Sequence, residues 1–186
     1  MLTARLQLAP PTSEDAPGIL AIAGDLRAVQ HNPSDLLADL NEANELIGQW
    51  IRHWLDQGVG YWCVREAGQS RIVGYCGLKT STVNGCSVLN LIYRFAPDMW
   101  GCGYATEAAA AAVAWGREHW PDKVIVARVR PNNLASQNVA LKAGLRRDED
   151  FDAQGEDGQD LAFTNRTRHH GREAGWAASA DVPRPA

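Results

Sequence analysis

The chain has 186 residues, of which 45% are hydrophobic and 22% are charged, so we expect one globular domain with an ordinary core. Its net charge of -4 argues against a nucleic-acid partner, because proteins that bind phosphate backbones are usually basic. No stretch approaches the roughly 20 apolar residues of a membrane span, and the N-terminus lacks a signal-peptide core. We therefore expect no membrane partner and a cytoplasmic location. The four cysteines show no CxxC spacing, so neither a metal site nor a disulfide framework is predicted.

The N-terminal third of the chain predicts one strand and two helices. Leu2–Leu8 alternates apolar and polar residues, which is typical of a strand. Thr12 or Ser13 can cap a helix that continues to about Gln30. Ser34 is expected to cap a second helix, in which apolar side chains recur at helical spacing until Gly58.

The middle of the chain predicts three strands that follow one another directly. Tyr61–Glu66 and Arg71–Thr80 are apolar runs separated by a turn, and Cys86–Phe95 is a third. The dipeptide at residues 84–85 is Asn-Gly, a strong hairpin signal between strands. An antiparallel meander is therefore expected here.

The remaining elements alternate between helices and strands. A glycine-rich turn leads into an alanine-rich helix that ends before Pro121, and one face of this helix is small enough to lie close to a sheet. Lys123–Arg130 is predicted as a strand and Asn132–Ala143 as a helix. Asp150–Asp157 and Gln159–Asn165 are then predicted as a final strand pair.

This order of elements predicts an α+β or mixed α/β fold. We expect the domain to span residues 1–165. Residues 166–186 contain polar, small, Gly and Pro residues without any period, which predicts a flexible C-terminal tail.

The first chemical motif is the turn Gly101-Cys102-Gly103 between a strand and a helix. The first N–H groups of a helix have no internal partner, and the helix dipole adds positive charge there. Glycines remove the Cβ atoms that would keep a phosphate away, so this turn is a candidate anion site without Lys or Arg. Thr106 stands where a Rossmann fingerprint needs glycine, and the Walker Gly-Lys-Ser/Thr is absent.

The second motif lies one strand and one helix later. Asn132, Asn133 and Ser136 place polar groups at the start of a short helix, near the expected anion site. Taken alone, such residues are also typical of simple helix capping.

Together, the two motifs resemble the GCN5-related N-acetyltransferase (GNAT) superfamily, over roughly residues 3–165. The match is best with the branch that acetylates ribosomal-protein N-termini, polyamines and antibiotics. That branch often shows Pro-x-x-Trp-Gly-x-Gly-Tyr-Ala-Thr-Glu-Ala, and this chain has Pro97-Asp-Met-Trp-Gly-Cys-Gly-Tyr-Ala-Thr-Glu-Ala108. It also shows Asn-x-x-Ser and then Lys-x-Gly-Phe, which read here Asn133-Leu-Ala-Ser136 and Lys142-Ala-Gly-Leu145.

The resemblance implies a central, mostly antiparallel twisted sheet of about seven strands with a splayed strand pair, flanked by about four helices. It also implies acetyl-CoA, or another short acyl-CoA, as co-substrate. The backbone of the strand around Tyr93 would pair with pantetheine beside a bulge, and the amides after Trp100 would hold the pyrophosphate. The cofactor-binding residues implied in this way are Tyr93, Arg94, Phe95, Trp100, Gly101, Cys102, Gly103, Tyr104, Ala105, Thr106, Asn133 and Ser136.

The implied reaction is direct attack of a neutral primary amine on the thioester in a ternary complex, and the amine belongs to a small molecule or a protein N-terminus. Many relatives protonate the thiolate with a Tyr where this chain has Ala140, so Ser136 is the expected acid. Tyr93 could reach the acceptor side of the thioester or pack in the sheet. The general base is open, because Asn90 replaces a Glu that is frequent in the branch; the candidates are a water chain, Asp148, Glu149 and His31.

The sequence also allows a second function and an assembly of two chains. The absence of the usual Tyr and Glu also fits a non-catalytic acyl-CoA-binding sensor. A homodimer formed through an edge strand is a weaker expectation.

Overall fold

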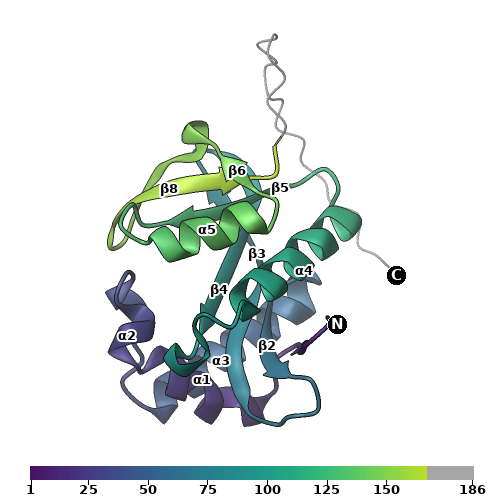
Figure 1. Cartoon of the computed structure of the whole chain (residues 1–186), viewed down its shortest axis with the longest axis vertical. Coiled ribbons are helices and arrows are strands. Elements are labelled where there is room, and N and C mark those ends of the chain that lie inside the picture. The colour runs from purple at the N-terminus through teal and green to yellow at the C-terminus, as the bar shows by residue number, and fades with distance from the viewer. Residues whose placement is uncertain (167–186) are drawn as a thin grey trace.

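The computed structural model describes residues 1–166, so the predicted tail lies outside the described residues apart from Arg166. Eight strands form one twisted sheet, in which β1 to β5, β8 and β6 follow in that order and β7 pairs with β8 (Figure 1). Only the β4–β5 pair is parallel among these pairings. The strands are β1 (Leu6–Ala9), β2 (Tyr61–Glu66), β3 (Ile72–Val83), β4 (Cys86–Phe95), β5 (Val124–Val129), β6 (Arg146–Arg147), β7 (Ala153–Gly155) and β8 (Gly158–Thr164).

Helices cover both faces of the sheet. They are α1 (Ala16–Ala23), α2 (Leu26–Val29), α3 (Leu40–Gln57), α4 (Tyr104–His119) and α5 (Leu134–Lys142). The first core cluster packs α4 and α5 on one face, and the second packs α1 and α3 on the other (Figure 1). The mixed α/β prediction and the mostly antiparallel sheet are therefore confirmed, with an eighth strand supplied by the two-residue β6.

The N-terminal helices differ from the sequence-based expectation. The helix expected up to Gln30 is broken, because Gly24 ends α1 and the Asp25 side chain caps α2 by accepting from the amide of Arg27 at 2.9 Å. Ser34 does not cap α3. Asp39 does so by accepting from two amides of the first turn.

The ends of other elements also shift. The first strand begins at Leu6, because residues before it fold back and the amide of Thr3 donates to the Leu6 carbonyl. The penultimate strand is confined to Ala153–Gly155, since Glu149–Phe151 forms a short 3-10 turn.

The parallel strands β4 and β5 separate at one end, which is the expected splayed pair. β4 pairs with β3 over its whole length, from Cys86 to Phe95, without a shift in register. Its pairing with β5 runs only from Val88 to Leu91. The pairing of β4 with β3 thus shows no bulge. β4 and β5 have no paired residues beyond Leu91 of β4, and this is where they separate.

The helix α4 lies close to the sheet on its small face, as the alanine-rich sequence predicts. Ala108, Ala109 and Ala112 are fully buried. A Cβ atom on Gly116 would come within 2.5 Å of Leu78 and 2.9 Å of Ile125. This close packing sets where the first turn of α4 points.

Candidate functional site

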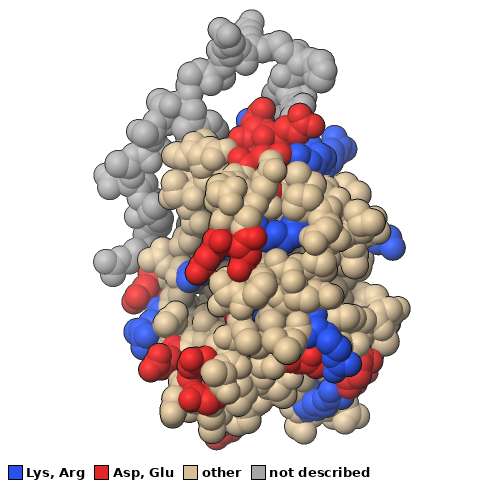
Figure 2. Space-filling model, turned by 90° about the vertical axis from the view of Figure 1, so that its left-hand side faces the viewer, with Lys and Arg blue, Asp and Glu red and all other residues tan. Residues whose placement is uncertain are grey.

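A cavity of about 610 Å³ lies at the point where β4 and β5 separate. Its first half is lined by the start of α4 and by α5, and its second half by residues 30–35 and the turn between β7 and β8. The side of the molecule that carries α2 and β8 shows acidic and basic side chains next to one another (Figure 2). The cavity therefore joins a helix N-terminus to a polar, mixed-charge compartment.

The turn before α4 has the geometry of an anion site. Gly101 and Gly103 have φ angles of 79° and 80°, a left-handed conformation that side-chain-bearing residues rarely adopt. A Cβ atom at Gly101 would meet nothing within 4 Å, so this backbone is open to a ligand. No side chain caps α4, and the amides of residues 104–106 have no acceptor within the described part of the chain. These features fit the phosphates of coenzyme A.

The N-terminal segment fixes the outer side of this turn. Glu107, in the first turn of α4, accepts hydrogen bonds from the Thr3 hydroxyl at 2.6 Å and the Arg5 amide at 2.8 Å. The Arg5 guanidinium donates to Glu107 at 2.7 Å and to the Cys102 carbonyl at 2.8 Å, and it lies 4.7 Å from the centre of the Tyr104 ring. The role of Arg5 was missed, because a partner about one hundred residues away leaves no local pattern.

Tyr93 and Ser136 form a pair between β4 and α5. The Tyr93 hydroxyl donates to the Ser136 carbonyl at 2.8 Å, and the Ser136 hydroxyl lies 3.0 Å from the Tyr93 oxygen. Burial raises the pKa of Tyr93 well above its usual range, so this phenol stays neutral. Asn133 caps α5 by accepting from the Ser136 amide at 3.0 Å, and Ala140 is fully buried behind it.

On the opposite face of β4, Asn90 and Arg94 point to the second half of the cavity. Arg94 donates to the Tyr75 hydroxyl at 2.9 Å and to Asp35 at 2.6 Å. The side-chain oxygen of Asn90 and the Nε of Arg128 are buried and have no hydrogen-bond partner among residues 1–166. Buried polar atoms are rarely left unpaired, so both are candidate contacts for a bound molecule.

Most of the predicted cofactor-binding residues line this one cavity. They are Tyr93, Arg94, Phe95, Trp100, Gly101, Gly103, Tyr104, Ala105, Thr106, Asn133 and Ser136. Cys102 does not line it, and its exposed thiol contacts the Trp100 carbonyl at 3.9 Å.

The base candidates are divided between two places. His31 lines the cavity, whereas Asp148 and Glu149 do not. Asp148 instead accepts from Thr164 and Arg166. Apart from Arg94, the arginines and aspartates of the second half of the cavity were missed, since single charged residues on separate strands form no motif; they are Asp35, Arg128, Arg130, Asp157 and Asp160.

No group of His, Cys, Asp or Glu within residues 1–166 has an arrangement that could hold a metal ion. No helix within this range is both long enough and apolar enough to cross a membrane.

Comparison with known proteins agrees with this geometry. The profile of the acetyltransferase (GNAT) domain matches residues 5–146. YkkB of Bacillus subtilis (strain 168), an uncharacterised protein, is 30% identical over 109 residues, which cover 59% of this chain and 63% of that protein.

Solved structures show the same fold. An acetyltransferase from Agrobacterium tumefaciens has a TM-score of 0.75 at 23% identity, over 90% of this chain and 94% of that one. RimL, a ribosomal-protein α-N-acetyltransferase in complex with coenzyme A, has a TM-score of 0.71 at 13% identity, over 88% and 94% of the two chains. Since the domain profile also covers well over half of the sequence, the chain belongs to the GNAT acetyltransferase family.

Proposed function

We propose that this protein transfers an acetyl group from acetyl-CoA to a primary amine by direct attack in a ternary complex. The observation that carries this proposal is the single cavity that joins the open amides of α4 to a polar compartment where β4 and β5 separate. One half suits a phosphorylated coenzyme and the other an amine. The acceptor is a small molecule or a peptide N-terminus.

The coenzyme is held mainly by backbone groups in this proposal. The amides from Gly101 to Thr106 bind the pyrophosphate, helped by the dipole of α4. The edge of β4 from Ile92 to Arg94, which has no pairing with β5, offers backbone groups to the pantetheine arm. When bound, acetyl-CoA supplies the acyl group as a thioester that a neutral amine can attack.

Ser136 is the group proposed to pass a proton to the departing thiolate, and the nitrogen that has attacked the thioester gives up the proton that replaces it. Its hydroxyl and that of Tyr93 form a neutral pair, and the raised pKa of Tyr93 keeps the phenol protonated. The Tyr93 hydroxyl donates to the Ser136 carbonyl, and the Ser136 hydroxyl donates to the Tyr93 oxygen. Ser136 therefore has to turn its hydroxyl from Tyr93 to the thiolate. The demand is modest, because a free thiol has a pKa of about 8.5.

Asn90 is proposed to orient the amine. Its buried oxygen accepts no hydrogen bond from residues 1–166, and an unpaired buried acceptor costs about 1–3 kcal/mol. An N–H of the incoming amine satisfies this acceptor and turns the nitrogen lone pair toward the thioester. The side-chain amide of Asn90 cannot act as a base. The amine therefore has to be in its neutral form before it attacks the thioester.

The test is thiol release from acetyl-CoA in the presence of a mixed panel of amines and short peptides. Release that depends on any acceptor supports the proposal and excludes the alternative of a coenzyme-binding sensor. Tight coenzyme binding with no release from any acceptor favours the sensor. Absence of measurable coenzyme binding rejects both.

A further inference from the structure

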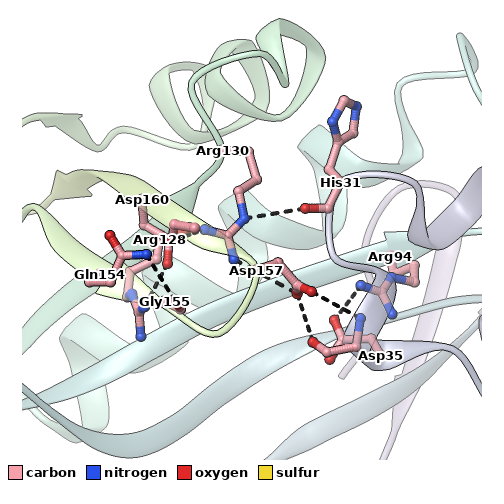
Figure 3. Close-up of polar contacts among 11 residues, drawn as sticks. His31, Asp35, Arg94, Arg128, Arg130, Gln154, Gly155, Asp157 and Asp160 are labelled. Atoms are coloured by element: carbon pink, nitrogen blue, oxygen red, sulfur yellow. Dashed lines mark hydrogen bonds and ion pairs between the residues drawn. The ribbon is translucent and has the colours of Figure 1, made fainter.

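Two segments far apart in the sequence meet at the acceptor half of the cavity (Figure 3). One is residues 30–35, between α2 and α3. The other is the turn at residues 155–158, between β7 and β8. Both line the cavity, so whatever joins them forms its wall.

Arg130, which follows β5, lies between the two segments. Its Nε donates to the His31 carbonyl at 3.2 Å, and its Nη1 donates to the Gly158 carbonyl. The same guanidinium is 3.0 Å from Asp160 and 3.8 Å from Asp157. Only 7% of the Arg130 side chain is exposed, so these partners have to stabilise its positive charge in place of water.

Asp157 continues the link to the first segment. It accepts from the Ser34 hydroxyl at 2.6 Å and from the Ser34 amide at 3.2 Å. Asp160 is shared with Arg128, whose guanidinium lies 2.5 Å away. Two guanidinium groups and two carboxylates therefore neutralise one another inside this wall.

Apolar packing does not hold the two segments together. None of the three hydrophobic clusters of the described residues includes a residue of 30–36 or 154–159. The link is polar, and we call Ser34, Arg130 and Asp157, with the His31 carbonyl, the clasp. Breaking it should loosen both segments while the core remains packed.

We propose that the clasp is a specificity-determining wall of the acceptor site, which admits small amines and disfavours amines carried on a bulky body. This inference rests on the proposed function. The segments that the clasp joins bound the cavity, so a small amine beneath them contacts an ordered wall. An amine attached to a large body has to separate the segments, and it loses the energy of these charge-assisted bonds.

The test uses two variants of the full chain at less buried members of the clasp, Ser34→Ala and Asp157→Ala, because replacing buried Arg130 could prevent folding. Arg147→Gln is the control. It removes a comparable ion pair, in which the Arg147 guanidinium lies 2.5 Å from Asp152, and neither residue lines the cavity. Hydrogen exchange of residues 30–36 and 154–159 is measured without any ligand. Steady-state kinetics use one small amine and the same amine at the N-terminus of a bulky peptide.

In both clasp variants, exchange of both segments should accelerate by about tenfold, as expected for losing one or two charge-assisted bonds. The KM for the small amine should rise by a similar factor, the preference over the bulky amine should shrink, and the Kd for acetyl-CoA should not change. The control should change none of these values. If hydrogen exchange accelerates only in the segment that carries the substitution, the proposal is wrong. It is also wrong if the preference for the small amine over the bulky amine does not change. If wild-type protein releases no thiol with any amine, the proposed function fails, and exchange still decides whether the clasp couples the segments.

Discussion

Replacing Gly101 with alanine tests whether the turn before α4 binds the coenzyme. At a φ of 79° a side-chain-bearing residue is strained, yet a Cβ here meets nothing within 4 Å. Gly68, in the turn between β2 and β3, has a φ of 78° and the same open surroundings, and it does not line the cavity. Gly68→Ala is therefore a control that carries equal strain and lies outside the site.

The two variants should lose the same stability. A left-handed conformation costs an L-residue about 1–2 kcal/mol, with no clash to add in either case. For a chain of this size, each kcal/mol lowers Tm by about 2–4 °C. Only the Gly101→Ala variant places a methyl group where a phosphate has to approach backbone amides, so its affinity for coenzyme A should fall at least about tenfold, or 1.4 kcal/mol.

Titration calorimetry with coenzyme A, together with thermal unfolding, separates these effects. Equal Tm losses with weaker coenzyme binding in Gly101→Ala alone are the expected result. If both variants bind coenzyme A like the wild type, the amides at the start of α4 do not hold its phosphates. The functional assignment of this turn would then be wrong.

Three further predictions concern other groups. Ser136→Ala should lower kcat most below pH of about 8.5 and less above it, where a thiolate departs unaided; a uniform kcat deficit at all pH values contradicts the acid role. Burial raises the pKa of Tyr75 to about 12, against the opposing effect of Arg94, so the folded state holds this proton longer. The stability that this raised pKa contributes is complete below pH 10 and is lost as the pH rises toward 12. The free energy of unfolding in urea should therefore fall by roughly 2–3 kcal/mol over this range, and Tyr75→Phe should reduce that fall. Glu107→Gln should cost about 1–2 kcal/mol through its bonds to Thr3 and Arg5, whereas exposed Glu118→Gln should cost almost nothing.

The sequence was sufficient for features that local patterns determine. The hairpin at Asn84-Gly85, the small face of α4 and the glycine-rich turn before it each depend on residues close together in the chain. The spacing of two motifs then predicted where β4, α4 and α5 meet, and most of the residues named from these motifs line one cavity.

Features set by distant partners could not be predicted in this way. Ser34 fits a helix N-cap by composition, but its hydroxyl bonds Asp157, which is 123 residues later, and Asp39 takes the cap. The hydrogen bonds of Arg5 to Cys102 and of Arg130 to His31 likewise join segments about one hundred residues apart. The backbone of the turn before α4 thus follows from local glycines, whereas the side chains that fix this turn and those of the second half of the cavity come from distant pairs.

Under the proposed function, this division lets an acidic protein bind a phosphorylated coenzyme as well as an amine. Backbone amides and a helix dipole supply the positive potential for phosphates without using a net charge. In the proposed acceptor half, each of three arginines is paired with an aspartate, so their charges are neutralised within the wall of the cavity; they are Arg94, Arg128 and Arg130. The groups proposed to touch the reacting atoms, Ser136 and Asn90, are uncharged at any moderate pH. The pH dependence of acyl transfer should therefore follow mainly the ionisation of the amine itself, because only its neutral form attacks.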